Sequence, residues 1–195
     1  MTCAITDRPE PQALETLSAK LPHIQQSPKV EGVLALIVRR PQVDAREVLP
    51  EGELNLLEGL AGDTWNKRRS SRTPDGSPHP DMQLNLMNVR VIEAIAGKIK
   101  RWPLAGDQLY VDLDLSQANI PPGTRLSIGD AVIEITPQPH TGCTKFAARF
   151  GRDALKFVNS PEGRMLGLRG VNAKVIQPGR LKVWDSVRKL VNCDS

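Results

Sequence analysis

The sequence contains no long apolar segment. Its best apolar run, residues 33–38, ends at Arg39-Arg40 and is far shorter than the roughly 18 residues that a transmembrane helix needs. Asp7, Arg8 and Pro9 stand where a secretory signal would need an uninterrupted apolar stretch. We therefore expect a cytoplasmic protein that has no membrane partner.

Cysteine is equally scarce. The chain has three cysteines, Cys3, Cys143 and Cys193, and two of them lie near the termini. Such a set is too small and too uneven for a disulfide framework. No Cys-x-x-Cys motif or second histidine pair accompanies them, so the sequence predicts neither a zinc site nor an iron–sulfur cluster.

Aromatic residues are few as well. Three Trp, one Tyr and three Phe offer little surface on which nucleic-acid bases could stack. The net charge of +4 is a mild bias toward anionic ligands. Nucleic acid is therefore not an expected partner.

The length and composition suit one folded domain. The chain has 195 residues, of which 39% are hydrophobic and 25% charged, as is usual for a soluble domain with its own core. We expect an N-terminal appendage over residues 1–31 with a short helix over 13–21, a domain body over 32–190 and a tail over 191–195.

The body alternates short strands with turns rich in Gly and Pro. Alternating or β-branched runs predict strands over 32–40, 82–86 and 108–115, a hairpin over 126–136, and a second hairpin over 171–184 with a type II turn at Pro178-Gly179. Helical spacing predicts helices over 89–96, between Asn88 and Gly97, and over 153–158. About seven strands with three or four short helices indicate an α+β protein that is mainly β. We expect a closed or nearly closed, mixed but mostly antiparallel β-barrel.

A long loop over residues 59–80 interrupts this pattern. It contains Lys67-Arg68-Arg69-Ser70-Ser71-Arg72, with four positive charges in six residues. Such a run could cradle a phosphate group, although most charge runs in loops are simply solvated.

Cys143 is the principal candidate for chemistry. It follows Gly142, at a point where a strand has ended and a helical turn can begin. Backbone N–H groups, Lys145 and Arg149 would favour the thiolate, which can attack sulfur, carry a persulfide or bind a soft metal. The alternative is a small buried residue that fills a loop.

Other residues could assist the thiol. His140 could move a proton near it, or could simply be bonded to backbone, and a Cys/His pair for acyl transfer also remains open. Arg164 and Arg169 stand among Gly163, Gly167 and Gly170, where glycines would let backbone donors approach an anion. The alternative is a surface turn with two salt-bridged arginines.

Five ordered landmarks resemble the MOSC domain, a family named for the C-terminal domain of molybdenum cofactor sulfurases. They are Gly62-Asp63, Gln83-Leu84-Asn85-Leu86, Gly106-Asp107-Gln108-Leu109, the segment Pro121-Pro122-Gly123-Thr124-Arg125-Leu126-Ser127-Ile128-Gly129, and Pro139-His140-Thr141-Gly142-Cys143. The resemblance covers roughly residues 32–190.

The resemblance implies a β-barrel similar to that of pyruvate kinase, and a functional cysteine at Cys143. This cysteine would ligate the molybdenum of molybdopterin or carry sulfur as a persulfide, with a sulfur donor or acceptor protein as partner. Cofactor contacts are implied for these residues: Gln83, Gln108, His140, Thr141, Cys143, Lys145, Arg164 and Arg169. Pyridoxal phosphate, known in the family from another domain of the sulfurase, is not expected, because no Schiff-base lysine is apparent.

Three positions depart from the pattern of many relatives. Thr64-Trp65 follows Asp63 where relatives have Arg-His, Asp107-Gln108-Leu109 replaces Glu-Asn-Leu, and Gly142 replaces a proline. An alternative function is a molybdenum-dependent reductase of N-hydroxylated compounds, and it would need a separate redox partner because the chain has no flavin or iron–sulfur motif. A noncatalytic anion-binding barrel is the second alternative.

Overall fold

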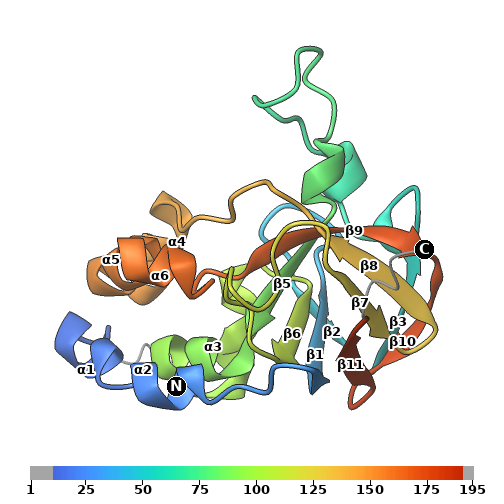
Figure 1. Ribbon diagram of the computed structural model, residues 1–195. Coiled ribbons are helices and arrows are strands. Elements are labelled where there is room, and N and C mark those ends of the chain that lie inside the picture. Colours follow the sequence, from blue (N-terminus) through green and yellow to red (C-terminus); the bar gives the residue numbers. More distant parts are fainter. Residues whose placement is uncertain (1–10, 191–195) are drawn as a thin grey trace, which may run out of the picture.

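A closed barrel of seven strands forms the centre of the computed structural model, which describes residues 11–190 (Figure 1). The order around the barrel is β11-β7-β8-β9-β5-β6-β1, and pairing of β1 with β11 closes it. Among the strands of residues 11–190, only β5 and β6 pair in parallel. The strands are β1 (Glu31–Arg39), β5 (Leu84–Asn88), β6 (Leu109–Asp112), β7 (Arg125–Ile128), β8 (Ala131–Ile135), β9 (Val171–Gln177) and β11 (Ser186–Lys189). The expected mixed, mostly antiparallel barrel is confirmed.

The remaining strands lie outside the barrel. β2 (Glu47–Leu49) pairs with β1, while β3 (Glu51–Asn55), β4 (Gly59–Leu60) and β10 (Gly179–Lys182) form a separate sheet of three strands. The predicted hairpin over 171–184 is therefore wrong, because β10 pairs with β3 and not with β9. Gly179 also has no positive φ. Glycine is needed at position 179 for a different reason. A Cβ there would lie only 2.5–2.6 Å from backbone atoms of Asp130 and Ala131.

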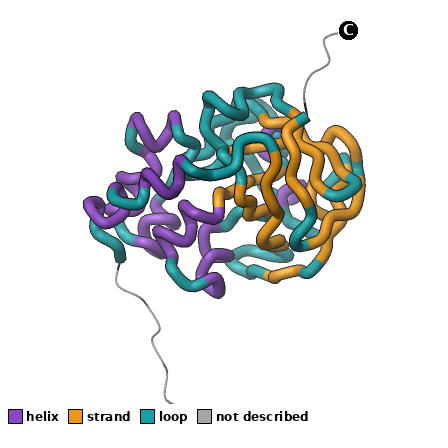
Figure 2. The backbone as a smooth tube through the Cα atoms, turned by 60° about the horizontal axis from the view of Figure 1, so that its bottom comes forward, coloured by secondary structure: helices purple, strands orange, loops and turns teal. Residues whose placement is uncertain are grey.

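Helices cover one flank of the barrel (Figure 2). They are α1 (Leu14–Ser18), α2 (Leu21–Gln25), α3 (Val89–Ala96), α4 (Thr144–Phe150), α5 (Arg152–Asn159) and α6 (Pro161–Met165), with 3₁₀ turns η1 (Trp65–Lys67), η2 (Pro80–Met82) and η3 (Ile99–Ala105). The helix expected over 13–21 is two helices, because Pro22 suits the first turn of α2 and cannot continue α1. Among the described residues, no helix is long and apolar enough to cross a membrane.

The helix α3 forms as its sequence predicts. The side chain of Asn88 accepts hydrogen bonds from the N–H groups of Arg90 and Val91, and Gly97 ends the helix with a φ of 65°. Leu17 of α1 and Ile24 of α2 are buried in the same helical cluster as α3. The rest of the predicted appendage, residues 1–10, and the predicted tail, 191–195, lie outside the described residues.

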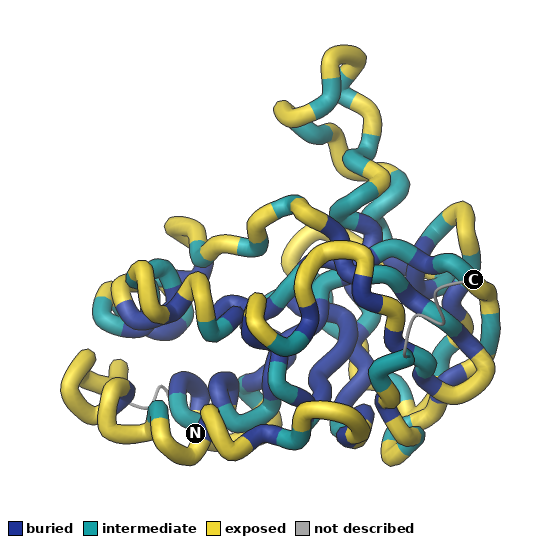
Figure 3. The backbone as a smooth tube through the Cα atoms, in the orientation of Figure 1, coloured by how far each residue is buried: buried dark blue, intermediate teal, exposed yellow. Residues whose placement is uncertain are grey.

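Strands β1, β5 and β6 separate two hydrophobic cores, one inside the barrel and one among the helices. In β6, Leu109 and Val111 point into the barrel, whereas Tyr110 packs among the helices and donates a hydrogen bond to the carbonyl of Trp102. β1 contributes to both cores, with a register shift after Leu34. The buried residues lie along the strands and the inner sides of the helices, and the loop that projects from the barrel is mostly exposed (Figure 3).

The barrel core predicts a steep cost for shortening an inward-pointing side chain. Leu109 is fully buried, so Leu109→Ala should lower the free energy of unfolding by about 2–5 kcal/mol in a denaturant titration. Leu57→Ala, at a side chain that is 82% exposed, is the matched control and should stay within about 0.5 kcal/mol of the native value. Equal losses in the two variants would contradict this packing.

Candidate functional site

A cleft of about 680 Å³ lies where the end of the barrel meets α6. Four of the residues predicted to contact a ligand line it together: His140, Thr141, Arg164 and Arg169. Arg72 from the long loop lies on the same cleft, and its Nη1 donates a hydrogen bond to Oε1 of Gln138 at 3.2 Å. No Asp or Glu is among the lining residues. The cleft therefore suits an anionic ligand, in a size range typical of small-molecule sites.

A buried ion pair lies behind one wall of the cleft, where Arg169 is a lining residue and its partner Asp107 is fully buried. Nη1 of Arg169 lies 2.9 Å from both carboxylate oxygens of Asp107, and Nη2 donates to the carbonyl of Ala105. The guanidinium carbon is 5.0 Å from the centre of the Phe146 ring in α4. Arg169 thus connects three segments: the one before β6, the one before β9, and α4. Its Nε is buried and has no partner among the described residues.

His140 packs against this pair. Its side chain is 12% exposed, and its Nδ1 lies 3.6 Å from Oδ1 of Asp107 without a hydrogen bond. Burial, with the nearby charges of Arg169 and Arg40, holds the pKa of His140 well below its usual value. The imidazole is therefore neutral near pH 7 and is a poor acceptor of a proton, because its surroundings disfavour the charged form.

The segment from His140 to Cys143 is fixed by α5. The N–H of Gly142 donates to Oδ1 of Asn159 at 2.9 Å, and Nδ2 of Asn159 donates back to the carbonyl of Gly142 at 3.0 Å. A Cβ at residue 142 would lie 2.7 Å from the Cδ1 of Leu155, so a larger residue here would have to displace the end of that side chain. Cys143 comes next, exposed, just before the first residue of α4. Cys143 itself does not line the cleft: it lies two residues after Thr141, the last cleft-lining residue of this segment, and is open to solvent.

The other predicted contacts lie elsewhere. Nζ of Lys145 is 3.8 Å from Oδ1 of Asp44, and Lys145 does not line the cleft. Gln83 is buried, and its amide bonds to the N–H of Val175 and to the carbonyl of Leu56. Gln108 is likewise fully buried, with both ends of its amide bonded to backbone. These two glutamines hold strands together beneath the site.

A second buried ion pair was not anticipated from the sequence. Arg40 donates to both carboxylate oxygens of Asp63 at 2.8 Å, and its Nη1 also reaches Oδ1 of Asn85 at 3.1 Å. Nδ2 of Asn85 in turn donates to Oδ1 of Asn172 at 2.6 Å. Arg40, two residues after the apolar run 33–38, is the available signal, since a charge at the end of a buried strand requires a partner.

The depressed pKa of His140 predicts a pH-dependent stability. In the unfolded chain, His140 binds a proton once the pH falls below its ordinary pKa, near 6.5. In the folded protein, His140 stays neutral until the pH is much lower. The free energy of unfolding should therefore fall as the pH drops below about 6.5, by up to about 1.4 kcal/mol per pH unit from this group. Thermal melts should show a smaller decline between pH 7 and 5 in His140→Gln than in the native chain. Parallel declines would contradict this assignment.

Comparisons with known proteins agree with this architecture. The chain resembles the YuaD protein from Bacillus subtilis with 16% identity and a TM-score of 0.56, over 80% of this chain and 94% of that one. It resembles YiiM from Escherichia coli with 19% identity and a TM-score of 0.54, over 84% and 72%. YiiM from Geobacillus stearothermophilus gives 13% identity and a TM-score of 0.56, over 85% and 77%. At these identities the likeness shows a shared fold.

Comparison of the sequence with protein-family models identifies the family. A comparison with curated proteins finds no match, but the model of the MOSC domain matches residues 76–188. This range is more than half of the chain and includes His140, Cys143 and Arg169. The chain therefore belongs to the MOSC domain family.

Proposed function

We propose that this protein binds molybdenum cofactor, with the sulfur of Cys143 as the protein ligand to molybdenum, and acts in handling the cofactor or its sulfur. The observation that carries the proposal is the exposed thiol at the end of the segment that lines a cationic cleft. A thiolate is a soft ligand of the kind that suits such a metal. Within residues 11–190, no cluster of three or more His, Cys, Asp or Glu side chains could hold a metal ion, so Cys143 would act as a single protein ligand.

The residues of the cleft fit the organic part of the cofactor. Arg164 is exposed, lies on the cleft and has no ion-pair partner among the described residues, so it could bind a phosphate group. The buried, unpartnered Nε of Arg169 is a free donor, and the neutral Nδ1 of His140 is a free acceptor, as ring nitrogens and carbonyls of a pterin require. The bound metal would supply oxygen-atom and electron-transfer chemistry, while the chain binds and orients it.

Metal analysis tests the assignment. Protein produced in cells that make the cofactor should contain molybdenum, and Cys143→Ser should not retain it. Loss of even an outer-shell partner typically lowers metal affinity about 10- to 100-fold, so loss of the ligand itself should cost at least as much. Cys193→Ser, which removes a thiol elsewhere in the chain, is the matched control. Undiminished molybdenum in Cys143→Ser would refute ligation by this residue.

The exposure of Cys143 also favours a second role, as a sulfur carrier. Its thiolate would attack the outer sulfur of a donor persulfide. A new S–S bond forms, the donor's S–S bond breaks, and the donor leaves as a thiolate, so no oxidant is required. The reductase alternative needs a separate redox partner and stays a prediction.

Incubation with a persulfide donor tests the carrier role. Intact-mass measurement should show an added mass of about 32 Da, one sulfur atom, that maps to Cys143 and is removed by a thiol reductant. The peptide that contains residue 143 should lose the added mass in Cys143→Ser and keep it in Cys193→Ser. An unmodified Cys143 under conditions that modify other thiols would exclude the carrier role.

A further inference from the structure

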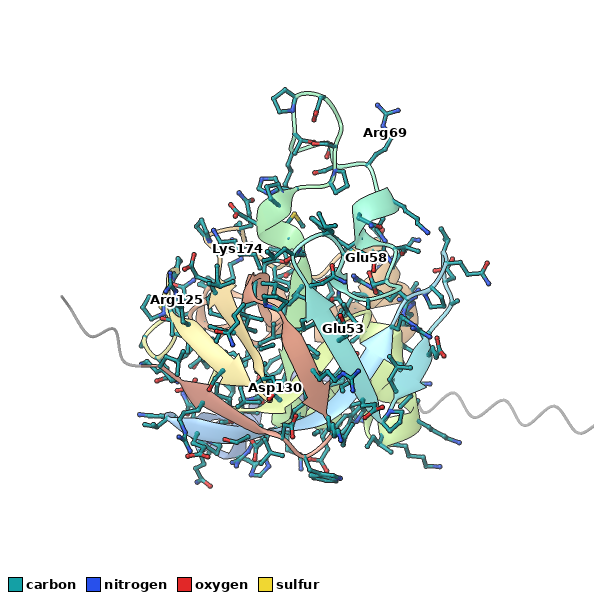
Figure 4. All side chains as sticks on the ribbon, turned by 90° about the vertical axis from the view of Figure 1, so that its right-hand side faces the viewer. Glu53, Glu58, Arg69, Arg125, Asp130 and Lys174 are labelled. Atoms are coloured by element: carbon teal, nitrogen blue, oxygen red, sulfur yellow. The ribbon has the colours of Figure 1, made fainter. Side chains whose placement is uncertain are left out.

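A second, smaller pocket lies beside the cleft, where the projecting loop joins the barrel. We call it the basic-loop pocket; it has a volume of about 270 Å³ and is lined by Trp65, Arg68, Arg69, Arg72 and His79, among others. No Asp or Glu lines it. Arg69 stands on the loop that projects from the barrel (Figure 4). The loop predicted from sequence as either a phosphate cradle or a solvated run thus forms a concave cationic surface.

The cations of this loop lack carboxylate partners. Arg68 bonds only to Oγ1 of Thr64, at 2.9 and 3.1 Å, and Arg72 bonds to Gln138. None of Arg68, Arg69 and Arg72 has a carboxylate within ion-pair distance in the part of the chain that the structure describes. Arg40, at the base of the pocket, is neutralised by Asp63. Three uncompensated guanidinium groups therefore meet in one pocket.

The electrostatic setting of Arg68 is unfavourable without an anion. Although Arg68 is exposed overall, desolvation by its surroundings and the nearby charge of Arg40 lower its pKa to about 10. A bound oxyanion would offset the repulsion and supply acceptors for the planar N–H groups of the guanidinium. The positive charge, the hydrogen-bond donors and the concave shape of the pocket thus all suit an oxyanion.

We propose that the basic-loop pocket is a binding site for the oxyanion of a phosphorylated small molecule. Its volume is below the range of whole small-molecule sites, so it would hold a group and not a complete ligand. Its concave shape and single aromatic residue, Trp65, favour a small molecule over a nucleic acid, which would need several stacking platforms. Arg72 lines both this pocket and the cleft, so a ligand in the cleft could extend into it.

Titration of molybdenum-free protein with inorganic phosphate and pyrophosphate, at constant ionic strength, tests the site. Calorimetry and the fluorescence of Trp65, with Trp65→Phe to identify its signal, should report saturable binding. Arg68→Ala and Arg72→Ala should each weaken binding about tenfold or more, as expected for loss of a charge-assisted hydrogen bond. Arg68→Lys should also weaken binding, because it keeps the charge but not the planar donors.

Two controls make the result decisive. Arg180→Ala removes the same charge from an exposed residue of β10 that lines neither pocket, and it should leave the affinity unchanged. Equal weakening in Arg68→Ala and Arg180→Ala, or binding that does not saturate, would overturn the proposal. Tighter binding to single-stranded RNA than to pyrophosphate, unaffected by Arg68→Ala, would also overturn it.

Repeating the titration on protein loaded with molybdenum cofactor identifies the source of the oxyanion. Competition between the cofactor and pyrophosphate would assign the pocket to a phosphate of the molecule in the cleft. Independent binding would assign it to a separate phosphorylated compound. The first titration requires neither molybdenum nor Cys143. If it shows no binding, the proposal that Cys143 ligates molybdenum is unaffected. If the protein does not bind molybdenum, the proposal for the basic-loop pocket is unaffected.

Discussion

The buried ion pair between Asp107 and Arg169 is the constraint on which the site depends. It joins the segment before β6 to the segment before β9, and Arg169 also packs on Phe146 of α4. His140 lies against the pair. Removing one partner of such a pair typically costs about 3–5 kcal/mol, because the other charge is left buried. The ion pair thus supports the wall of the cleft against which His140 packs, while hydrogen bonds between Asn159 and Gly142 fix the segment that leads to Cys143.

Two kinds of positive charge meet at this end of the barrel. Arg169 and Arg40 are buried and neutralised by Asp107 and Asp63, so they chiefly fix the positions of the surrounding segments. Arg72 and Arg164 are exposed and have no carboxylate partner among the described residues. The buried arginines therefore organise the cleft, and the exposed arginines remain available for a ligand.

Local features could be predicted from the sequence, whereas long-range pairing could not. The helix over 89–96 was predicted with its exact bounds because Asn88 and Gly97 mark its ends chemically. The pairing of β11 with β1 and of β10 with β3 could not be predicted, because these partners lie far apart in the chain. The sequence motifs also point to His140, Thr141, Arg164 and Arg169, and the structure brings these four residues to one cleft; their contact with a ligand stays a prediction. The contributions of Arg72 and Asp107 depend on contacts across the fold.

The central claim is that an exposed thiol beside a cationic cleft ligates molybdenum. X-ray absorption at the molybdenum edge of the loaded protein tests it most directly, because sulfur and oxygen ligands differ in their distance from the metal. We expect Cys143→Ser, if it retains any metal, to have one sulfur ligand fewer than the native protein. An identical sulfur shell in the two proteins would contradict the account.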